Sequence, residues 1–313
     1  MLKILLIAAD TSRFTNNNYH DFEQELAKRT HLMVYRKSGP IQKILRKIPE
    51  KPDFIFIIND VGKTFAPVVT GLSDISIPAG LMVNDAHRFV EQRRRYITRS
   101  NIRTFFVICR HNFHHHYPDQ KHHQVFFLPQ FANTAIFKDY GKEKTIDLMM
   151  LGEVSFPEIY PLREKILQHY QDSSDFFSRP HPGWQDFTSK QAETSLIGEN
   201  YAKTIHQAKL FFACGSVRQV VTFKYFEVPA CRTLLLAPVL PELKKIGLIP
   251  GVHFVDINAE NFPEKAEYYL KNTKERKKIT EAGYQFVHHH HSTAHRTEQF
   301  VQQVKLVQKL HQK

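Results

Sequence analysis

The 313-residue chain carries 43 lysines and arginines against 31 aspartates and glutamates, and 42% of its residues are hydrophobic. This composition excludes a chain that is disordered throughout, and the length suits two domains of about 150 residues each. The formal net charge of +12 favours anionic ligands such as nucleotides, nucleic acid or an acidic membrane face, although a solvated basic surface would explain it equally well.

The beginning of the chain and its cysteines indicate a cytoplasmic protein. The apolar run 2–9 is short and is followed by Asp10, which favours a buried first strand over a signal peptide. The three cysteines are odd in number and lie in or beside apolar runs, so we expect reduced thiols. No stretch reaches the roughly 18 apolar residues that a membrane span needs.

Short apolar runs alternate with helical segments through the first half of the chain. The predicted strands are 2–9, 31–35, 52–58, 77–83, 103–109 and 124–128. The predicted helices are 19–30, 40–48 and 89–99. Continuous apolar strands separated by helices indicate a parallel sheet that is covered on both faces, which is a Rossmann-like half.

Residues 129–145 lose this periodicity and are predicted to be a linker, after which the pattern restarts. The strands expected in the second half are 147–152, 175–178, 209–214, 233–237 and 252–257. The helices expected there are 162–170, 200–207, 223–230, 263–272, 273–287 and 293–310. The sequence thus predicts an α/β protein of the GT-B plan, with two Rossmann-like domains facing each other across a cleft and a C-terminal helix crossing back. The expected domains are 1–135 on the acceptor side, 136–292 for nucleotide-sugar binding, and the returning helix 293–313.

A family resemblance runs through the second half in four ordered stretches. They comprise 151–155 with 160–163, then 201–202 leading to 208–210, then 224–231, and finally 275–276, 282–284, 291–293 and Arg296. Together they resemble the glycosyltransferases grouped with the spore maturation protein CgeB, within the large class that includes glycosyltransferase family 4. In the first half, residues 77–87 are similar to the strand that delivers a His or Asp into such clefts.

The resemblance implies an enzyme that moves a sugar from a nucleoside-diphosphate sugar to an acceptor. UDP is the expected nucleotide from its frequency in the family, and the acceptor is not specified. The reaction would be retaining and independent of a metal, with no cofactor beyond the donor substrate. The donor would bind the second domain and the acceptor the first.

Glu227 is the first candidate for donor binding. In similar enzymes this glutamate accepts hydrogen bonds from both ribose hydroxyls, which the forked geometry of a carboxylate allows. An acidic residue favoured near a helix start by the helix dipole is the alternative.

The donor diphosphate needs positive charge and close backbone approach. Lys224 and Arg163 are the candidate cations, together with the helix start near Thr222, and Gly152 would let the backbone approach the donor. Exposed helix charges are the alternative for both cations. The remaining donor-binding candidates are Ser155, His181 and Gly215.

Asp85 and His87 are the catalytic candidates in the first half. They follow the end of an apolar strand, where parallel sheets place their ligands. His87 would bind the transferred sugar, and Asp85 would hold it or act as a base. A pair satisfied within its own loop is an equally good explanation.

The chain contains 19 histidines, but the sequence predicts no physiological metal site. His291 and His295 have a zinc-like i, i+4 spacing, yet there is no H-E-x-x-H motif and no cysteine pair nearby. The Walker, G-x-S-x-G and G-x-G-x-x-G motifs are absent too, which disfavours P-loop kinases, ordinary α/β hydrolases and dinucleotide redox enzymes.

Three positions depart from the family pattern: Glu153 replaces an arginine, Gln219 a glutamate and Arg232 a glycine. Gln219 and Glu153 motivate a second hypothesis, a non-catalytic nucleotide- or glycan-binding protein that kept the fold. Nucleic-acid binding ranks third and is not expected, because the basic residues are scattered. The basic segment 40–51 would suit contact with an anionic membrane, although an ordinary covering helix explains it as well.

Overall fold

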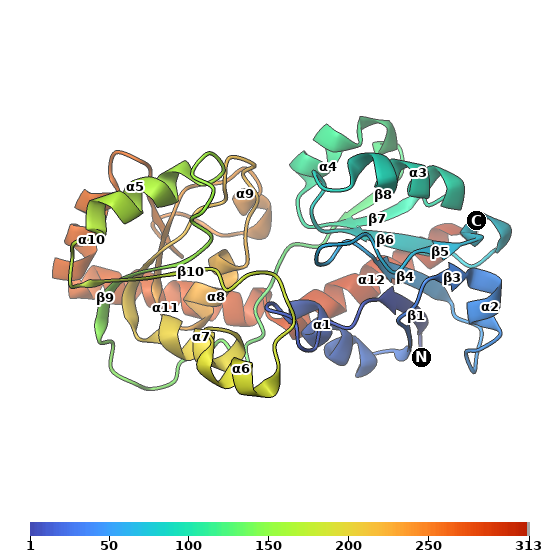
Figure 1. Cartoon of the computed structure of the whole chain (residues 1–313), viewed down its shortest axis with the longest axis horizontal. Helices are drawn as coiled ribbons and strands as arrows, with labels where there is room; N and C mark the ends of the chain where they lie inside the picture. The colour runs from blue at the N-terminus through green and yellow to red at the C-terminus, as the bar shows by residue number, and fades with distance from the viewer. Residues whose placement is uncertain (312–313) are drawn as a thin grey trace. The chain divides into compact units, whose positions relative to one another are not determined.

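The computed structural model describes residues 1–311, which fall into two compact units (Figure 1). The first unit contains residues 1–12, 19–129 and the chain from residue 296 onward, and the second contains residues 13–18 and 130–295. Each unit is built on its own parallel sheet. The predicted α/β class with two Rossmann-like domains is therefore confirmed.

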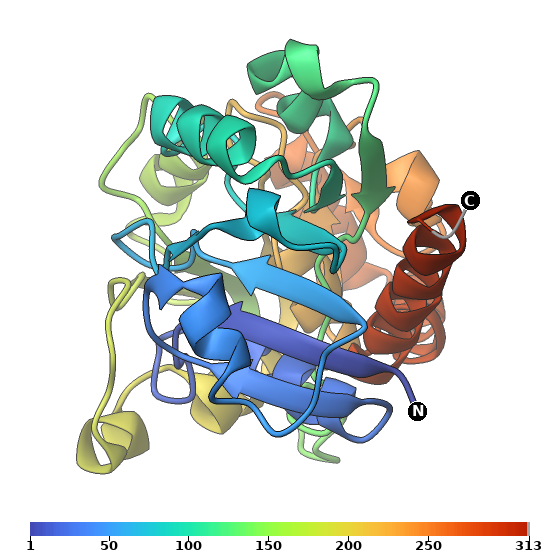
Figure 2. The same ribbon diagram turned by 90° about the vertical axis from the view of Figure 1, so that its right-hand side faces the viewer.

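The first unit contains a six-stranded parallel sheet in the order β2-β1-β4-β6-β7-β8 (Figure 2). Its strands are β1 (Lys3–Ala8), β2 (His31–Tyr35), β4 (Phe54–Ile58), β6 (Ala79–Val83), β7 (Thr104–Val107) and β8 (Gln124–Phe127). The neighbouring interior strands β1 and β4 are buried almost completely, which explains why their sequences are continuously apolar rather than alternating.

Helices cover the sheet of the first unit. They are α1 (Asn18–Ala27), α2 (Ile41–Leu45), α3 (Val90–Ser100), α4 (Arg110–His116) and α12 (Thr293–His311). Two short 3-10 helices, η1 (Leu72–Asp74) and η2 (Pro118–Gln120), and the two-stranded pair β3 (Gly39–Pro40) and β5 (Val69–Thr70) complete it.

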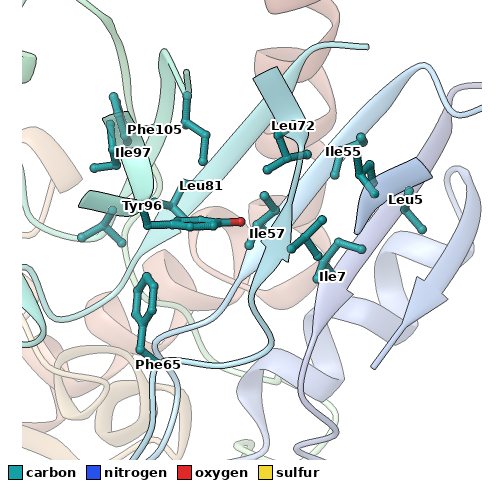
Figure 3. Close-up of a cluster of buried hydrophobic side chains, with 14 of the residues drawn as sticks. Leu5, Ile7, Ile55, Ile57, Phe65, Leu72, Leu81, Tyr96, Ile97 and Phe105 are labelled. Carbon is teal, nitrogen blue, oxygen red and sulfur yellow. The ribbon is translucent and has the colours of Figure 1, made fainter. Parts of the chain in front are cut away.

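Successive side chains of a β-strand point to opposite faces of the sheet, so the hydrophobic core of the first unit has two parts, one on each face. Ile55 and Ile57 belong to one cluster, which includes Tyr96 of α3 (Figure 3). Phe56 packs instead against Phe300 of α12, with ring centroids 4.4 Å apart. The last helix is thus part of the core of the first unit.

Other contacts fix α12 to the same sheet. The Phe300 ring also lies 4.9 Å from Phe106 and 5.5 Å from Phe22. The side-chain amides of Gln299 and Gln303 both donate to the Phe127 carbonyl at 3.1 Å. The predicted return of the C-terminal helix to the first half is therefore confirmed.

The second unit contains a five-stranded parallel sheet in the order β10-β9-β11-β12-β13. Its strands are β9 (Ile146–Gly152), β10 (Phe176–Pro180), β11 (Ala208–Phe212), β12 (Leu234–Ala237) and β13 (Val255–Asp256). Its helices are α5 (Pro161–Tyr170), α6 (Ser189–Thr194), α7 (Gly198–His206), α8 (Lys224–Ala230), α9 (Leu243–Ile246), α10 (Phe262–Lys271) and α11 (Thr273–His290).

The segment 40–51 differs from its prediction. The helix expected over 40–48 is only the five residues of α2, because Gly39 and Pro40 pair with β5 instead. Ile41 and Ile44 of α2 are buried, so this helix covers the core as the alternative explanation required.

None of the helices among residues 1–311 combines the length and the apolar character that crossing a lipid bilayer requires.

Replacing Phe300 by alanine should destabilise the first unit by about 3–5 kcal/mol, the usual cost of emptying a buried phenylalanine site. Hydrogen exchange of peptides from β4 and β6 would measure the effect within this unit. Leu306→Ala, on an exposed position of the same helix, should leave the exchange nearly unchanged. Equal exchange in both variants would contradict the packing of α12 on this sheet.

Candidate active site

Two positive side chains meet at the end of the first strand of the second unit. β9 ends at Gly152, whose φ of 143° favours glycine. A Cβ atom at Gly152 would lie 3.2 Å from Nη1 of Arg163 and 3.3 Å from Nζ of Lys224. Glycine therefore leaves room for both cations beside the backbone at this point.

Arg163 carries a positive charge although its side chain is only 4% exposed, and several contacts fix its position. It lies in the first turn of α5, which begins at Pro161, a residue well suited to a helix start. Its Nη1 donates to the Glu153 carbonyl at 2.8 Å, and its guanidinium lies 4.1 Å from the centre of the Tyr160 ring. Within residues 1–311, no carboxylate lies within ion-pair distance of Arg163 or Lys224.

Glu227 follows Lys224 by one turn of α8 and is 5% exposed. Burial is the main cause that raises its pKa to about 7, while the charge of Lys224 and the neighbouring polar side chains of Tyr201 and Asn18 act in the opposite direction. Sequence reasoning missed Tyr201 and Asn18 as partners, because they come from distant helices, α7 and the start of α1. Both residues belong with Glu227 to the second unit.

The pKa of Lys224 moves in the opposite direction from that of Glu227. Burial and the charge of Arg163 lower it, Glu227 partly opposes both effects, and the resulting pKa is about 8. Near pH 7.5, Lys224 is therefore positive and Glu227 negative, with each close to its titration range.

His181 lies beside Gly152. It follows β10, and its backbone N–H donates to the Gly152 carbonyl at 3.1 Å. Burial and the neighbouring Lys224 lower its pKa to about 4, so the ring is neutral at pH 7. Nδ1 accepts the Gly183 N–H at 3.0 Å, which assigns the ring proton to Nε2. The ring packs 4.6 Å from the half-exposed Trp184.

The other two donor-binding candidates lie on loops. Ser155 is exposed, and its backbone N–H donates to the Glu153 carboxylate at 2.8 Å. A Cβ at Gly215 would lie 2.4 Å from Leu240 and 2.8 Å from the Val220 carbonyl, so this glycine permits close packing of the loop after β11. The structure thus brings five of the seven candidates together: Gly152, Arg163, His181, Lys224 and Glu227.

The catalytic candidates Asp85 and His87 belong to the first unit, directly after β6. Asp85 lies 3.8 Å from the guanidinium of Arg88, and the His87 ring is 6.5 Å from that of His116. Phe89, at the start of α3, has a φ of 54°, which costs energy for a bulky residue and marks this turn as tightly constrained.

The buried Arg93 and its partner Asp60 form hydrogen bonds with the backbone of the 84–88 loop. Its Nη1 donates to the Arg88 carbonyl at 2.8 Å and to the Tyr117 hydroxyl at 2.7 Å. Its Nη2 pairs at 2.8 Å with Asp60, and both side chains of this ion pair are fully buried. Asp60 also accepts the Asn84 N–H at 2.9 Å. Arg93 therefore positions the loop that carries Asp85 and His87.

Arg93 lies in the predicted helix 89–99 and is not among the candidate residues from the sequence. The signal that could have identified it is the polar pair Asn59-Asp60 directly after the apolar strand β4. An acid at the buried end of a parallel strand requires a partner.

Two of the three departures from the family pattern have a structural explanation. Arg232 has a φ of 55°, in the region that favours glycine, but its guanidinium pairs with Asp139 at 2.6 Å and with Glu281. The Glu153 carboxylate accepts the N–H groups of Val154 and Ser155 and so stabilises its own loop. Gln219 also has a positive φ, 53°, and nothing in the structure explains the choice of glutamine.

The histidines of the cluster 288–291 contribute to packing within the protein. His288 hydrogen-bonds the Ala230 carbonyl at 3.1 Å, and the buried His291 hydrogen-bonds the Ile246 carbonyl at 3.0 Å. No three His, Cys, Asp or Glu side chains converge as metal ligands anywhere in residues 1–311.

Comparison with known proteins points to one class. Residues 161–302, which include α5 and α8, match the family model described as glycosyl transferase-like. No curated protein matches the chain significantly. The fold resembles that of solved GT-B glycosyltransferases, which confirms the predicted GT-B plan.

Three solved structures illustrate the resemblance. Sucrose-phosphate synthase from Thermosynechococcus elongatus is 10% identical with a TM-score of 0.65, and the alignment covers 98% of this chain and 99% of that one. Anabaena HepE in complex with UDP-glucose is 9% identical with a TM-score of 0.63, covering 97% and 100%. An alpha-glucosyltransferase in complex with UDP and a DNA 13-mer is 10% identical with a TM-score of 0.57, covering 97% and 100%. The family match and this shared fold support the predicted class, a glycosyltransferase.

Asp60→Asn should destabilise the first unit by about 3–5 kcal/mol, because it leaves the buried Arg93 without its ionic partner. Hydrogen exchange of the 84–88 loop and of β6 would measure the loss. Asp119→Asn is the matched control, since the ion pair of Asp119 with Arg94 is partly exposed and such pairs contribute at most about 1 kcal/mol. Similar exchange in the two variants would contradict the positioning role of Arg93.

Proposed function

We propose that the chain transfers a sugar from a nucleoside-diphosphate sugar, with UDP as the nucleotide, to an acceptor bound by the first unit. The observation that carries this proposal is the meeting of Arg163 and Lys224 at Gly152. Two buried or partly buried cations without a carboxylate at ion-pair distance are a costly arrangement that a bound dianion would stabilise.

The diphosphate would take the place beside Gly152. The Arg163 guanidinium offers a planar pair of donors suited to phosphate oxygens, and Lys224 adds a compact charge. The neutral His181 would donate from Nε2 to the same group or to the sugar. These donors would stabilise the negative charge that develops on the leaving diphosphate, without a metal ion.

The ribose would bind Glu227. A carboxylate has acceptor positions for both ribose hydroxyls in addition to Tyr201 and Asn18, or it can exchange these partners for them. UDP is favoured because relatives of the same fold were solved with UDP-glucose and with UDP. Ser155 and Gly215 would shape the loops around the donor.

The acceptor side of the reaction would use Asp85 and His87. In the transfer, an acceptor oxygen bonds to the anomeric carbon while the bond from that carbon to the diphosphate oxygen breaks and its electron pair leaves with the diphosphate. His87 would bind the transferred sugar, and Asp85 would hold it or take the acceptor proton. We propose retention of the anomeric configuration, as in the enzymes that the second half resembles.

Nucleotide-dependent thermal stabilisation tests the donor site. In a panel of UDP, GDP, ADP, TDP and CMP, one nucleotide should raise the thermal unfolding midpoint by several degrees. A ligand at about 100 times its Kd adds roughly 2.7 kcal/mol to the free energy of unfolding. Glu227→Gln should weaken this binding at least about tenfold, because the amide accepts at one atom only. Glu193→Gln, on an exposed position of the same unit, should bind like the unchanged chain.

The controls separate the alternatives. A folded protein that no nucleotide stabilises would overturn the donor-site assignment. Nucleotide binding that depends on Glu227, without hydrolysis or transfer from any nucleoside-diphosphate sugar, would favour the alternative of a non-catalytic binding protein.

Nucleotide affinity should pass through a maximum between about pH 7 and pH 8. Below this range Glu227 is protonated and loses its negative charge and part of its acceptor capacity, because its pKa is raised to about 7. Above it Lys224 is neutral and no longer attracts the diphosphate, because its pKa is lowered to about 8. Calorimetric Kd values across pH 6–9 would show two limbs. Lys224→Arg should remove the alkaline limb, and an unchanged alkaline limb in this variant would refute the role of Lys224.

A further inference from the structure

A trough of about 620 Å³ lies in the first unit, between α3 and the segment that contains β5. It is separate from the proposed donor site, all of whose residues belong to the second unit. Its volume falls within the range of about 300–1,000 Å³ that is usual for small-molecule sites. None of the candidate residues from the sequence lines it.

The wall of the trough is largely apolar. Phe65 and Tyr96 are both buried, and their rings meet edge to face with centroids 5.7 Å apart (Figure 3). Val68, which is partly exposed, extends this surface along the facing segment, and the fully buried Val69 lies behind it. Such a wall favours an apolar ligand body over a heavily hydroxylated one.

Two arginines of α3 line the same trough and give it positive charge. Arg95 and Arg99 are one helical turn apart and exposed. Neither makes an ion pair with any of residues 1–311, whereas the adjacent Arg93 and Arg94 are paired with acids. Acids also lie nearby: Glu91 is one turn before Arg95 on α3, and the Asp74 carboxylate would lie 3.5 Å from a Cβ at Gly71, which lines the trough.

We propose that this trough binds a single-chain amphipathic anion, an alkyl chain that carries a phosphate or carboxylate head. The chain would lie along Phe65, Tyr96 and Val68, and the head would bind Arg95 and Arg99. Guanidinium groups bind both kinds of head through paired hydrogen bonds. An uncharged lipid would leave the two arginines unused, and a nucleotide would bury its polar groups against an apolar wall.

Calorimetric titration of the full chain with dodecyl phosphate, below its micelle concentration, tests this inference. The unchanged chain should bind one equivalent, and Arg95→Gln/Arg99→Gln should weaken binding at least about tenfold, the effect of losing charged hydrogen bonds. Lys305→Gln/Lys309→Gln is the matched control, because it removes two exposed charges at the same spacing from α12 of the same unit. Its affinity should equal that of the unchanged chain.

Thr70→Trp provides an independent test of the location. Thr70 is exposed and lines the trough, so an indole at this position should fill the space and abolish binding without disturbing the core. Thermal unfolding and the response to UDP would verify that each variant is folded, and they also separate this inference from the proposed donor site.

Three results would overturn the inference: no binding of dodecyl phosphate, equal loss in the two charge variants, or binding that survives Thr70→Trp. Inorganic phosphate should bind at least about tenfold more weakly, since it lacks the chain. Association with vesicles of anionic lipid that is insensitive to Thr70→Trp, in the absence of monomeric dodecyl phosphate binding, would show a surface attraction to membranes instead.

Discussion

The positive charge of Arg163 and Lys224 at the end of β9, which the protein compensates only in part, is the constraint that shapes the candidate donor site of the second unit. Removing cations from water is costly, and the protein meets this cost in part through the Glu153 carbonyl, the Tyr160 ring and the negative charge of Glu227 one turn away. The opposed pKa shifts of Lys224 and Glu227 have the same cause: burial favours the neutral form of each group, and the charge of the other group partly opposes this effect. A bound diphosphate would add the missing negative charge.

The first unit also contains a buried charge at the end of a strand, but it pairs this charge with another residue of the same unit. Asp60 follows β4 at the carboxyl end of its strand, and the buried Arg93 pairs with it within the protein. The charge there stabilises a loop instead of attracting a ligand. Both units thus place polar groups where parallel strands end, as open α/β sheets generally do. At these strand ends the first unit pairs Arg93 with Asp60, whereas the second leaves Arg163 and Lys224 without an ion-pair partner among residues 1–311.

The sequence predicted the sheets well because buried parallel strands are continuous apolar runs, as in β4 and β11. Gly152, Arg163, Lys224 and Glu227 could be selected because they lie at strand ends and helix starts of a recognisable pattern. Tyr201, Asn18 and Arg93 could not, since only tertiary packing brings them to their partners. The expected domain ends at residues 135 and 292 and the roles of all site residues stay predictions.

The departures from the family pattern affect the site less than their chemistry suggests. Arg163 binds residue 153 through its backbone carbonyl, so a glutamate serves as well as another residue there. Arg232 follows the end of α8, whereas Lys224 and Glu227 lie in its first turn. A left-handed conformation costs a residue with a side chain about 1–2 kcal/mol, and the two ion pairs of Arg232 offset part of that cost. Replacement of the family glycine therefore changes local stability and leaves the charges around Gly152 intact.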